Sequence, residues 1–152
     1  MPAVSGLKLL VVDTGYSVDT LRNRNLERFV TERDLDGFFE KVWTVYPALG
    51  SSPDDRGGSA TIGPVSTAAI APRHNMVEGK IGRFRSFVRL PALNFALAQL
   101  SLLRYVSKLI KTETITFIRA DDPYYPALLG LLLARLHHIP LLIRVRANYD
   151  LI

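Results

Sequence analysis

Short apolar runs alternate with amphipathic stretches along most of the chain. The runs predict strands at 7–13, 41–46, 114–118 and 141–145, and the amphipathic stretches predict helices at 19–33 and 91–111. A further helix, apolar almost all round, is expected at 121–138. Weaker strands are expected at 61–65 and 68–71, short or at an edge because of Pro64 and Pro72. Strands that alternate with helices predict a Rossmann-like α/β fold, doubly wound around a mainly parallel sheet with helices on both faces.

The expected boundaries rest on a few turn and cap residues. Asp19 is a candidate N-cap for the first helix, which would end near Arg33. Pro47 should stop the second strand, and 50–59 is a loop by composition. The segment 121–123, Asp-Asp-Pro, is typical of a helix start, with proline at the first helical position.

A ligand site is expected where the strand order reverses, because ligands of open parallel sheets bind outside the carboxyl ends of the strands at that point. With the usual order, this point lies between the strands 7–13 and 114–118. The loops that face it carry much of the polar chemistry, namely Asp13, Thr14, Arg119, Asp121, Asp122 and Tyr124, with Arg144, Arg146, Asn148 and Tyr149 alongside.

Carboxylates and amides bind sugar hydroxyls, and arginine binds phosphate through a fork of donors, so a phosphorylated or glycosylated ligand would suit these loops. Two plainer interpretations stay open. Asp121 or Asp122 would serve only as a helix cap, or Arg144 and Arg146 would be solvent-exposed without a function.

The sequence lacks the motifs that mark several common classes of ligand and catalytic site. The turn after the first strand has Gly15 alone, so it matches neither the dinucleotide fingerprint nor a phosphate loop, and no G-x-S-x-G elbow occurs. The chain has no cysteine and 3 histidines, of which the adjacent His137 and His138 would point in different directions on a helix. No metal site is therefore expected.

Positive charge is concentrated in one region. The net charge is +5, yet 79–112 contains no acid. The bases in this region are Lys80, Arg83, Arg85, Arg89, Arg104, Lys108 and Lys111. Interleaved with Phe and Leu, they suit an anionic membrane surface. The alternatives are a phosphate backbone of nucleic acid, which the lack of an aromatic stacking platform disfavours, or a solvated outer face over core residues.

The expected location is cytoplasmic. The N-terminus does not begin like a secretory signal, and the longest apolar stretches, 92–106 and 124–134, are interrupted or too short to span a bilayer. We expect a soluble protein, at most peripheral on the inner face of the membrane.

Two segments carry a family resemblance: 118–130, Ile-Arg-Ala-Asp-Asp-Pro-Tyr-Tyr-Pro-Ala-Leu-Leu-Gly, and 139–150, Ile-Pro-Leu-Leu-Ile-Arg-Val-Arg-Ala-Asn-Tyr-Asp. With the first strand, its polar turn, and the helix and strand up to Pro47, they resemble the N-terminal half of a retaining GT-B glycosyltransferase of the family-four type. The resemblance implies a domain that binds a glycan or lipid-linked acceptor. The nucleotide-sugar donor and most catalytic residues would belong to a second, C-terminal domain, so no cofactor is expected here.

On this resemblance, Asp13 and Thr14 would bond acceptor hydroxyls, and Arg119 and Asp122 would orient them. The residues bordering the interdomain cleft would be Arg144, Arg146, Asn148 and Tyr149. The family's paired glutamates have the spacing of Glu32 and Glu40, but these fall in the acceptor half, so the match is taken as chance.

Two features depart from the family pattern: the single glycine after the first strand, and Arg146-Ala-Asn-Tyr149 where a histidine is often found. We expect residues 1–152 to form one truncated domain, inactive as a transferase on its own. The competing hypotheses are a non-catalytic basic binding module and a small epimerase-like enzyme.

Overall fold

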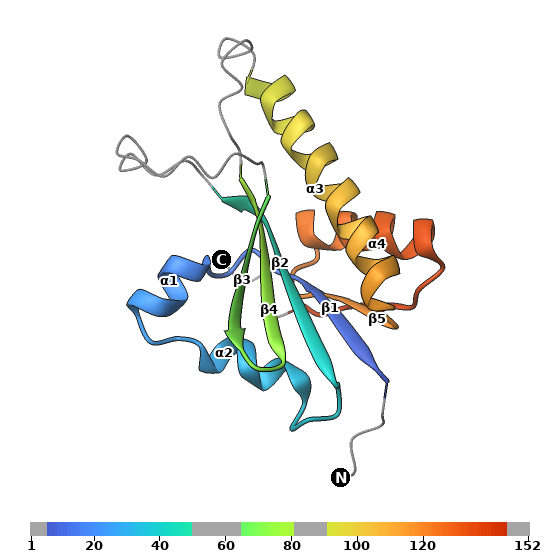
Figure 1. Ribbon diagram of the computed structural model, residues 1–152. Coiled ribbons are helices and arrows are strands. Elements are labelled where there is room, and N and C mark those ends of the chain that lie inside the picture. Colours follow the sequence, from blue (N-terminus) through green and yellow to red (C-terminus); the bar gives the residue numbers. More distant parts are fainter. Residues whose placement is uncertain (1–5, 50–64, 81–90, 146–152) are drawn as a thin grey trace.

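The protein is built on one six-stranded sheet. The computed structural model describes residues 6–49, 65–80 and 91–145 (Figure 1). The strands are β1 (Lys8–Val12), β2 (Lys41–Leu49), β3 (Val65–Ala71), β4 (His74–Lys80), β5 (Phe117–Ala120) and β6 (Leu141–Ile143). Their order is β3-β4-β2-β1-β5-β6, and only β3 and β4 pair antiparallel. The predicted α/β fold with a mainly parallel sheet is confirmed, as is the reversal of strand order between β1 and β5.

Helices cover both faces of the sheet (Figure 1). The first crossover contains α1 (Val18–Asn23), α2 (Arg28–Thr31) and the short 3-10 helix η1 (Glu32–Asp34) on one face. The opposite face is covered by α3 (Pro91–Glu113) and α4 (Tyr125–His137). Alternation along the strands divides the core: Leu10, Val12 and Ile118 pack under α3 and α4, whereas Leu9 and Val11 face the other way.

The first crossover differs from its prediction. One helix over 19–33 was expected, but the chain turns out of α1 at Asn25, which adopts a left-handed conformation (φ 52°). The Leu26 N–H closes this turn on the Leu21 carbonyl at 2.8 Å. The N-cap is Ser17, whose hydroxyl accepts from the Thr20 N–H, so the assignment of Asp19 was wrong.

The region of β2 to β4 was predicted only in part. Pro47 does not stop β2, which continues to Leu49 with an irregular register after Tyr46. The weak strand at 68–71 belongs to the longer β3, while 61–64 lies outside the described residues. β4 was not predicted, because its sequence carries buried polar residues, His74 and Glu78.

Boundaries in the second half shift by a few residues. Thr114 is left-handed (φ 53°), and the Ile115 N–H bonds back to the Ile110 carbonyl, so 114–115 close α3 and β5 starts only at Phe117. α4 starts at Tyr125, and its first-turn proline is Pro126, not Pro123. β6 ends at Ile143, two residues earlier than expected.

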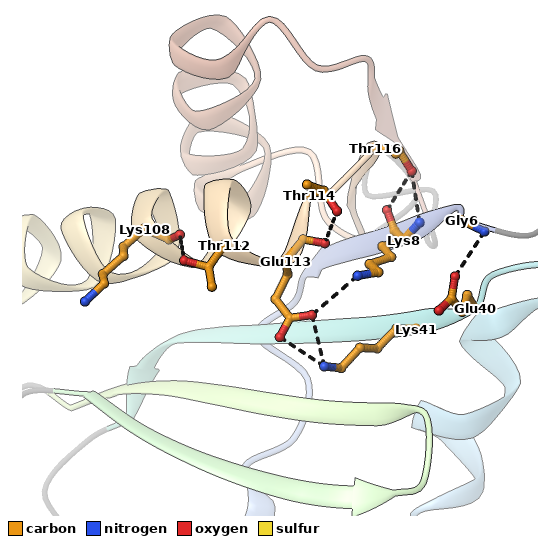
Figure 2. A network of polar contacts seen from close by, with 9 residues as sticks. All are labelled: Gly6, Lys8, Glu40, Lys41, Lys108, Thr112, Glu113, Thr114 and Thr116. Carbon is orange, nitrogen blue, oxygen red and sulfur yellow. Dashed lines mark hydrogen bonds and ion pairs between the residues drawn. The ribbon is translucent and has the colours of Figure 1, made fainter.

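A polar network fixes the end of α3 at the amino edge of the sheet (Figure 2). Lys41 places its Nζ 3.0 Å from both carboxylate oxygens of Glu113, and the Lys8 Nζ lies 3.7 Å from the same group. Thr116 joins the network through hydrogen bonds with the backbone of Lys8.

No helix in the described ranges is long and apolar enough to cross a membrane.

Candidate functional site

Two carboxylates lie side by side at the carboxyl edge of the sheet. Asp13 follows β1 and Asp121 follows β5, and both are buried, at 6% and 3% exposure. Their backbones continue the ladder, since the Asp13 N–H bonds the Val45 carbonyl and the Asp121 N–H bonds the Val12 carbonyl, each at 3.0 Å. The point between β1 and β5, where the strand order reverses, thus carries two buried acids, which need positive partners.

Arg33 supplies one of these partners. It comes from η1 and reaches over the sheet, where its Nη2 forms an ion pair with Asp13 and its Nη1 donates to the Thr44 hydroxyl at 3.0 Å. Burial lowers the pKa of Arg33 from its ordinary value, while Asp13 and Asp121 oppose this shift. A guanidinium is not deprotonated in proteins, so Arg33 remains a cation despite this shift.

Arg119 supplies the other. Its Nε lies 2.8 Å from Asp121 Oδ1, and its Nη2 donates to Oδ2 at 3.2 Å. Asp13, Arg33, Arg119 and Asp121 therefore form a buried set of two cations and two anions, here called the Asp–Arg cluster. Its formal charge is balanced, so it provides directed donors without a large net charge.

A cavity of about 500 Å³ opens over this cluster. It is called the switch-point pocket and is lined by Tyr16, Phe29, Glu32, Arg33, Leu35, Arg119, Arg144 and Val145. The Tyr16 and Phe29 rings form an aromatic wall, with centroids 6.1 Å apart. Arg144 follows β6, is exposed, and makes no ion pair within the described residues. Guanidinium donors beside an aromatic wall can bind a phosphate and the face of a sugar ring.

The structure brings together four of the residues expected to form the site. Asp13, Arg119 and Asp121 lie in the Asp–Arg cluster, and Arg144 lines the pocket. Neither Thr14 nor Tyr124 lines it, although both are exposed. Asp122 accepts a hydrogen bond from the Tyr124 N–H at 2.8 Å, which is a turn contact within its own loop, and the N-cap of α4 is Tyr124, not Asp121 or Asp122. Arg146, Asn148 and Tyr149 lie outside the described residues.

Sequence reasoning missed Arg33, Tyr16 and Phe29. Arg33 was placed at the end of a helix, where a basic residue is unremarkable, and nothing in its neighbours signals that it is 5% exposed. Tyr16 could have been found, because it lies in the loop after β1 that was expected to face the crevice.

A third buried carboxylate, Glu78, has a structural partner. Its Oε1 accepts from the Val18 N–H at 2.7 Å, and its other oxygen receives the Ser66 hydroxyl at 3.4 Å. The carboxylate thus occupies the N-terminus of α1, where it satisfies a backbone donor and interacts favourably with the helix dipole.

The predicted membrane-facing bases divide into three groups. Arg83, Arg85 and Arg89 lie outside the described residues. Lys80 ends β4 and is half-buried. Arg104, Lys108 and Lys111 are exposed on α3.

The residues that the structure describes contain no group of three or more His, Asp or Glu side chains arranged to hold a metal ion. No protein-family model, curated protein or solved structure matches this chain.

Proposed function

We propose that this chain is the acceptor-binding half of a retaining GT-B glycosyltransferase of the family-four type, and that its switch-point pocket holds a hydroxyl-rich, phosphate-bearing acceptor. The donor nucleotide sugar would be bound by a second domain, and transfer would require both halves. The observation that carries the proposal is the position of the pocket: it lies at the carboxyl edge, over the β1–β5 reversal, with Arg33 and Arg119 in its lining.

The chemistry of the lining supports this ligand class. Arg144 is an exposed cation with no ion-pair partner among the described residues, so it can pair with a phosphate. The aromatic wall of Tyr16 and Phe29 offers an apolar surface for a sugar ring. Arg33 and Arg119 are held in place by Asp13 and Asp121, which reduces the entropy lost when a ligand binds.

The N-terminus of α1 argues against the epimerase-like alternative. A dinucleotide-binding Rossmann domain places the pyrophosphate at the N-terminus of its first helix. Here the Glu78 carboxylate already accepts from the Val18 N–H at that point, and its negative charge would repel a phosphate. A dinucleotide would therefore lose the anchor on which that class of enzyme depends.

Amide chemical-shift titrations of the full chain test the proposal, with glucose 6-phosphate, glucose, inorganic phosphate and NAD as probes. Glucose 6-phosphate should shift signals around Tyr16 and Arg144 and bind more tightly than either glucose or phosphate alone. Arg144→Gln should weaken this binding by about tenfold, the loss of roughly 1.4 kcal/mol from a charge-assisted contact. Arg24→Gln removes the same charge from an exposed position outside the pocket and is the matched control.

Tighter binding of NAD than of glucose 6-phosphate would contradict the proposal. So would sugar-phosphate shifts that map away from the pocket, or equal effects of the two substitutions.

A further inference from the structure

The outer surface of α4 is apolar although it faces solvent. Leu128, Leu131, Leu132 and Leu136 are 40–65% exposed. The opposite side of the same helix, with Leu129 and Leu133, packs into the core against the sheet. A soluble surface seldom gathers this many large apolar side chains on one short helix, and such a patch usually marks an interaction site.

A row of cations runs along the neighbouring helix. Arg104, Lys108 and Lys111 are spaced four and three residues apart on α3, so they lie on one side of it, and all three are exposed. A groove of about 450 Å³ joins the two rows, since it is lined by these bases and by Leu136 of α4. Arg135 adds a further exposed base among the leucines.

Among the described residues, no ion pair involves the bases of this surface. Glu113 is the one acid in the sequences of α3 and α4. It is held at the amino edge of the sheet by Lys41 and Lys8 (Figure 2). The two helices therefore combine exposed leucines with bases that form no ion pair within the part of the chain that the structure describes.

We propose that this α3–α4 face, defined by the four exposed leucines and by Arg104, Lys108, Lys111 and Arg135, docks on a bilayer that contains anionic lipids. The leucines enter the boundary between headgroups and acyl chains, and the cations lie among the lipid phosphates. Each base at an anionic surface strengthens binding by about fivefold.

Charge complementarity favours an anionic bilayer over a second copy of the chain, and the exposed leucines favour it over nucleic acid. A second copy of the chain would bring one cationic row against another across a two-fold interface, which is unfavourable. Nucleic acid would pair with the bases but leave the leucines without a role, because its surface is phosphate and sugar.

The docking face belongs to α3 and α4, which lie on the opposite side of the sheet from α1 and α2 of the first crossover (Figure 1). Arg33 comes from η1 of that crossover. The switch-point pocket would thus stay accessible on a membrane-bound chain. Vesicle binding and ligand binding are separate properties, so either proposal can fail without the other.

Vesicle flotation of the full chain tests the inference, with phosphatidylcholine alone and with one third phosphatidylglycerol. The wild type should bind the anionic vesicles at least tenfold better. The triple variant Arg104→Gln, Lys108→Gln and Lys111→Gln should lose about 100-fold in affinity, from about fivefold for each base. The double variant Leu128→Ser and Leu132→Ser should also lose at least tenfold.

The matched control is Arg24→Gln, Arg28→Gln and Arg73→Gln, which removes the same charge from exposed positions outside α3 and α4. It should stay within about threefold of the wild type, since bases away from the bilayer contribute little. Equal losses in the two triple variants would overturn the proposal, as would full binding by the leucine variant. The proposal would also be overturned if the wild type did not bind anionic vesicles but formed a dimer that the leucine substitutions converted to a monomer. The occupant of the face would then be a second copy of the chain.

Discussion

Arg33 and Asp13 form a buried ion pair across 20 residues of sequence, between the short helix that precedes β2 and the carboxyl end of β1. Their side chains are 5% and 8% exposed. Arg33 lines the switch-point pocket, and the pair closes the first crossover onto the sheet. Its integrity is therefore a condition both for the fold and for the proposed site.

Removal of one partner from this pair should be costly. Arg33→Met leaves Asp13 buried without its cation, and we expect a loss of about 3–5 kcal/mol in the free energy of unfolding, measured by urea denaturation. The exposed pair of Arg28 and Glu32, at 86% and 58%, is the internal control. Arg28→Met should cost less than about 1 kcal/mol.

A double variant, Arg33→Met with Asp13→Leu, separates the ion pair from its packing. It should recover much of the lost stability, because an apolar pair of similar volume often replaces a buried ion pair without loss. A double variant no more stable than Arg33→Met would contradict the assignment of the cost to an unpaired charge.

The sequence predicted the strands whose burial follows from their own composition. β1 and β2 are largely buried, have few polar residues and were placed within a few positions, and the reversal between β1 and β5 was expected from the usual strand order of this fold. β4 was missed because its polar residues become acceptable only through distant partners: Glu78 meets the Val18 N–H, and His74 meets Asp34. No local pattern encodes such partners.

The candidate site was predictable to the extent that topology decides it. Asp13, Arg119 and Asp121 follow from the rule that ligand sites lie at the carboxyl edge. Arg33 does not, because its burial depends on how the first crossover folds. That crossover was predicted as one helix, whereas the left-handed Asn25 breaks it and redirects the chain across the sheet.

His74 should make the stability of the protein depend on pH. Burial lowers the pKa of His74, although Asp34, with its Oδ2 3.5 Å from Nε2, opposes the shift. The unfolded chain, with an ordinary pKa of about 6.5, thus binds a proton that the folded chain does not. Stability is full above that value and falls as the pH drops below it.

Urea denaturation at a series of pH values between about 7.5 and 5.5 measures this dependence. His74→Gln removes the titrating group, so its free energy of unfolding should fall less steeply over this range than that of the wild type. His74→Asn, a second neutral variant, should show the same reduced slope even if its absolute stability differs. Parallel curves for the wild type and both variants would assign the pH dependence to other groups.

Substitutions of Tyr16 and Tyr124 distinguish ligand binding in the switch-point pocket from binding over the loop of residues 121–124, which was also expected to contact the acceptor. Both rings are exposed, at 37% and 62%, but only Tyr16 lines the switch-point pocket. Tyr16→Ala should weaken binding of glucose 6-phosphate by about tenfold, equivalent to roughly 1.4 kcal/mol, through loss of the aromatic wall. Tyr124→Ala should leave the Kd within about twofold, and neither change should move the unfolding midpoint by more than about 3 °C. The reverse ranking, measured by the same amide titration, would place the ligand over the loop of residues 121–124, outside the pocket, and would leave Arg33 and Arg119 with a purely structural role.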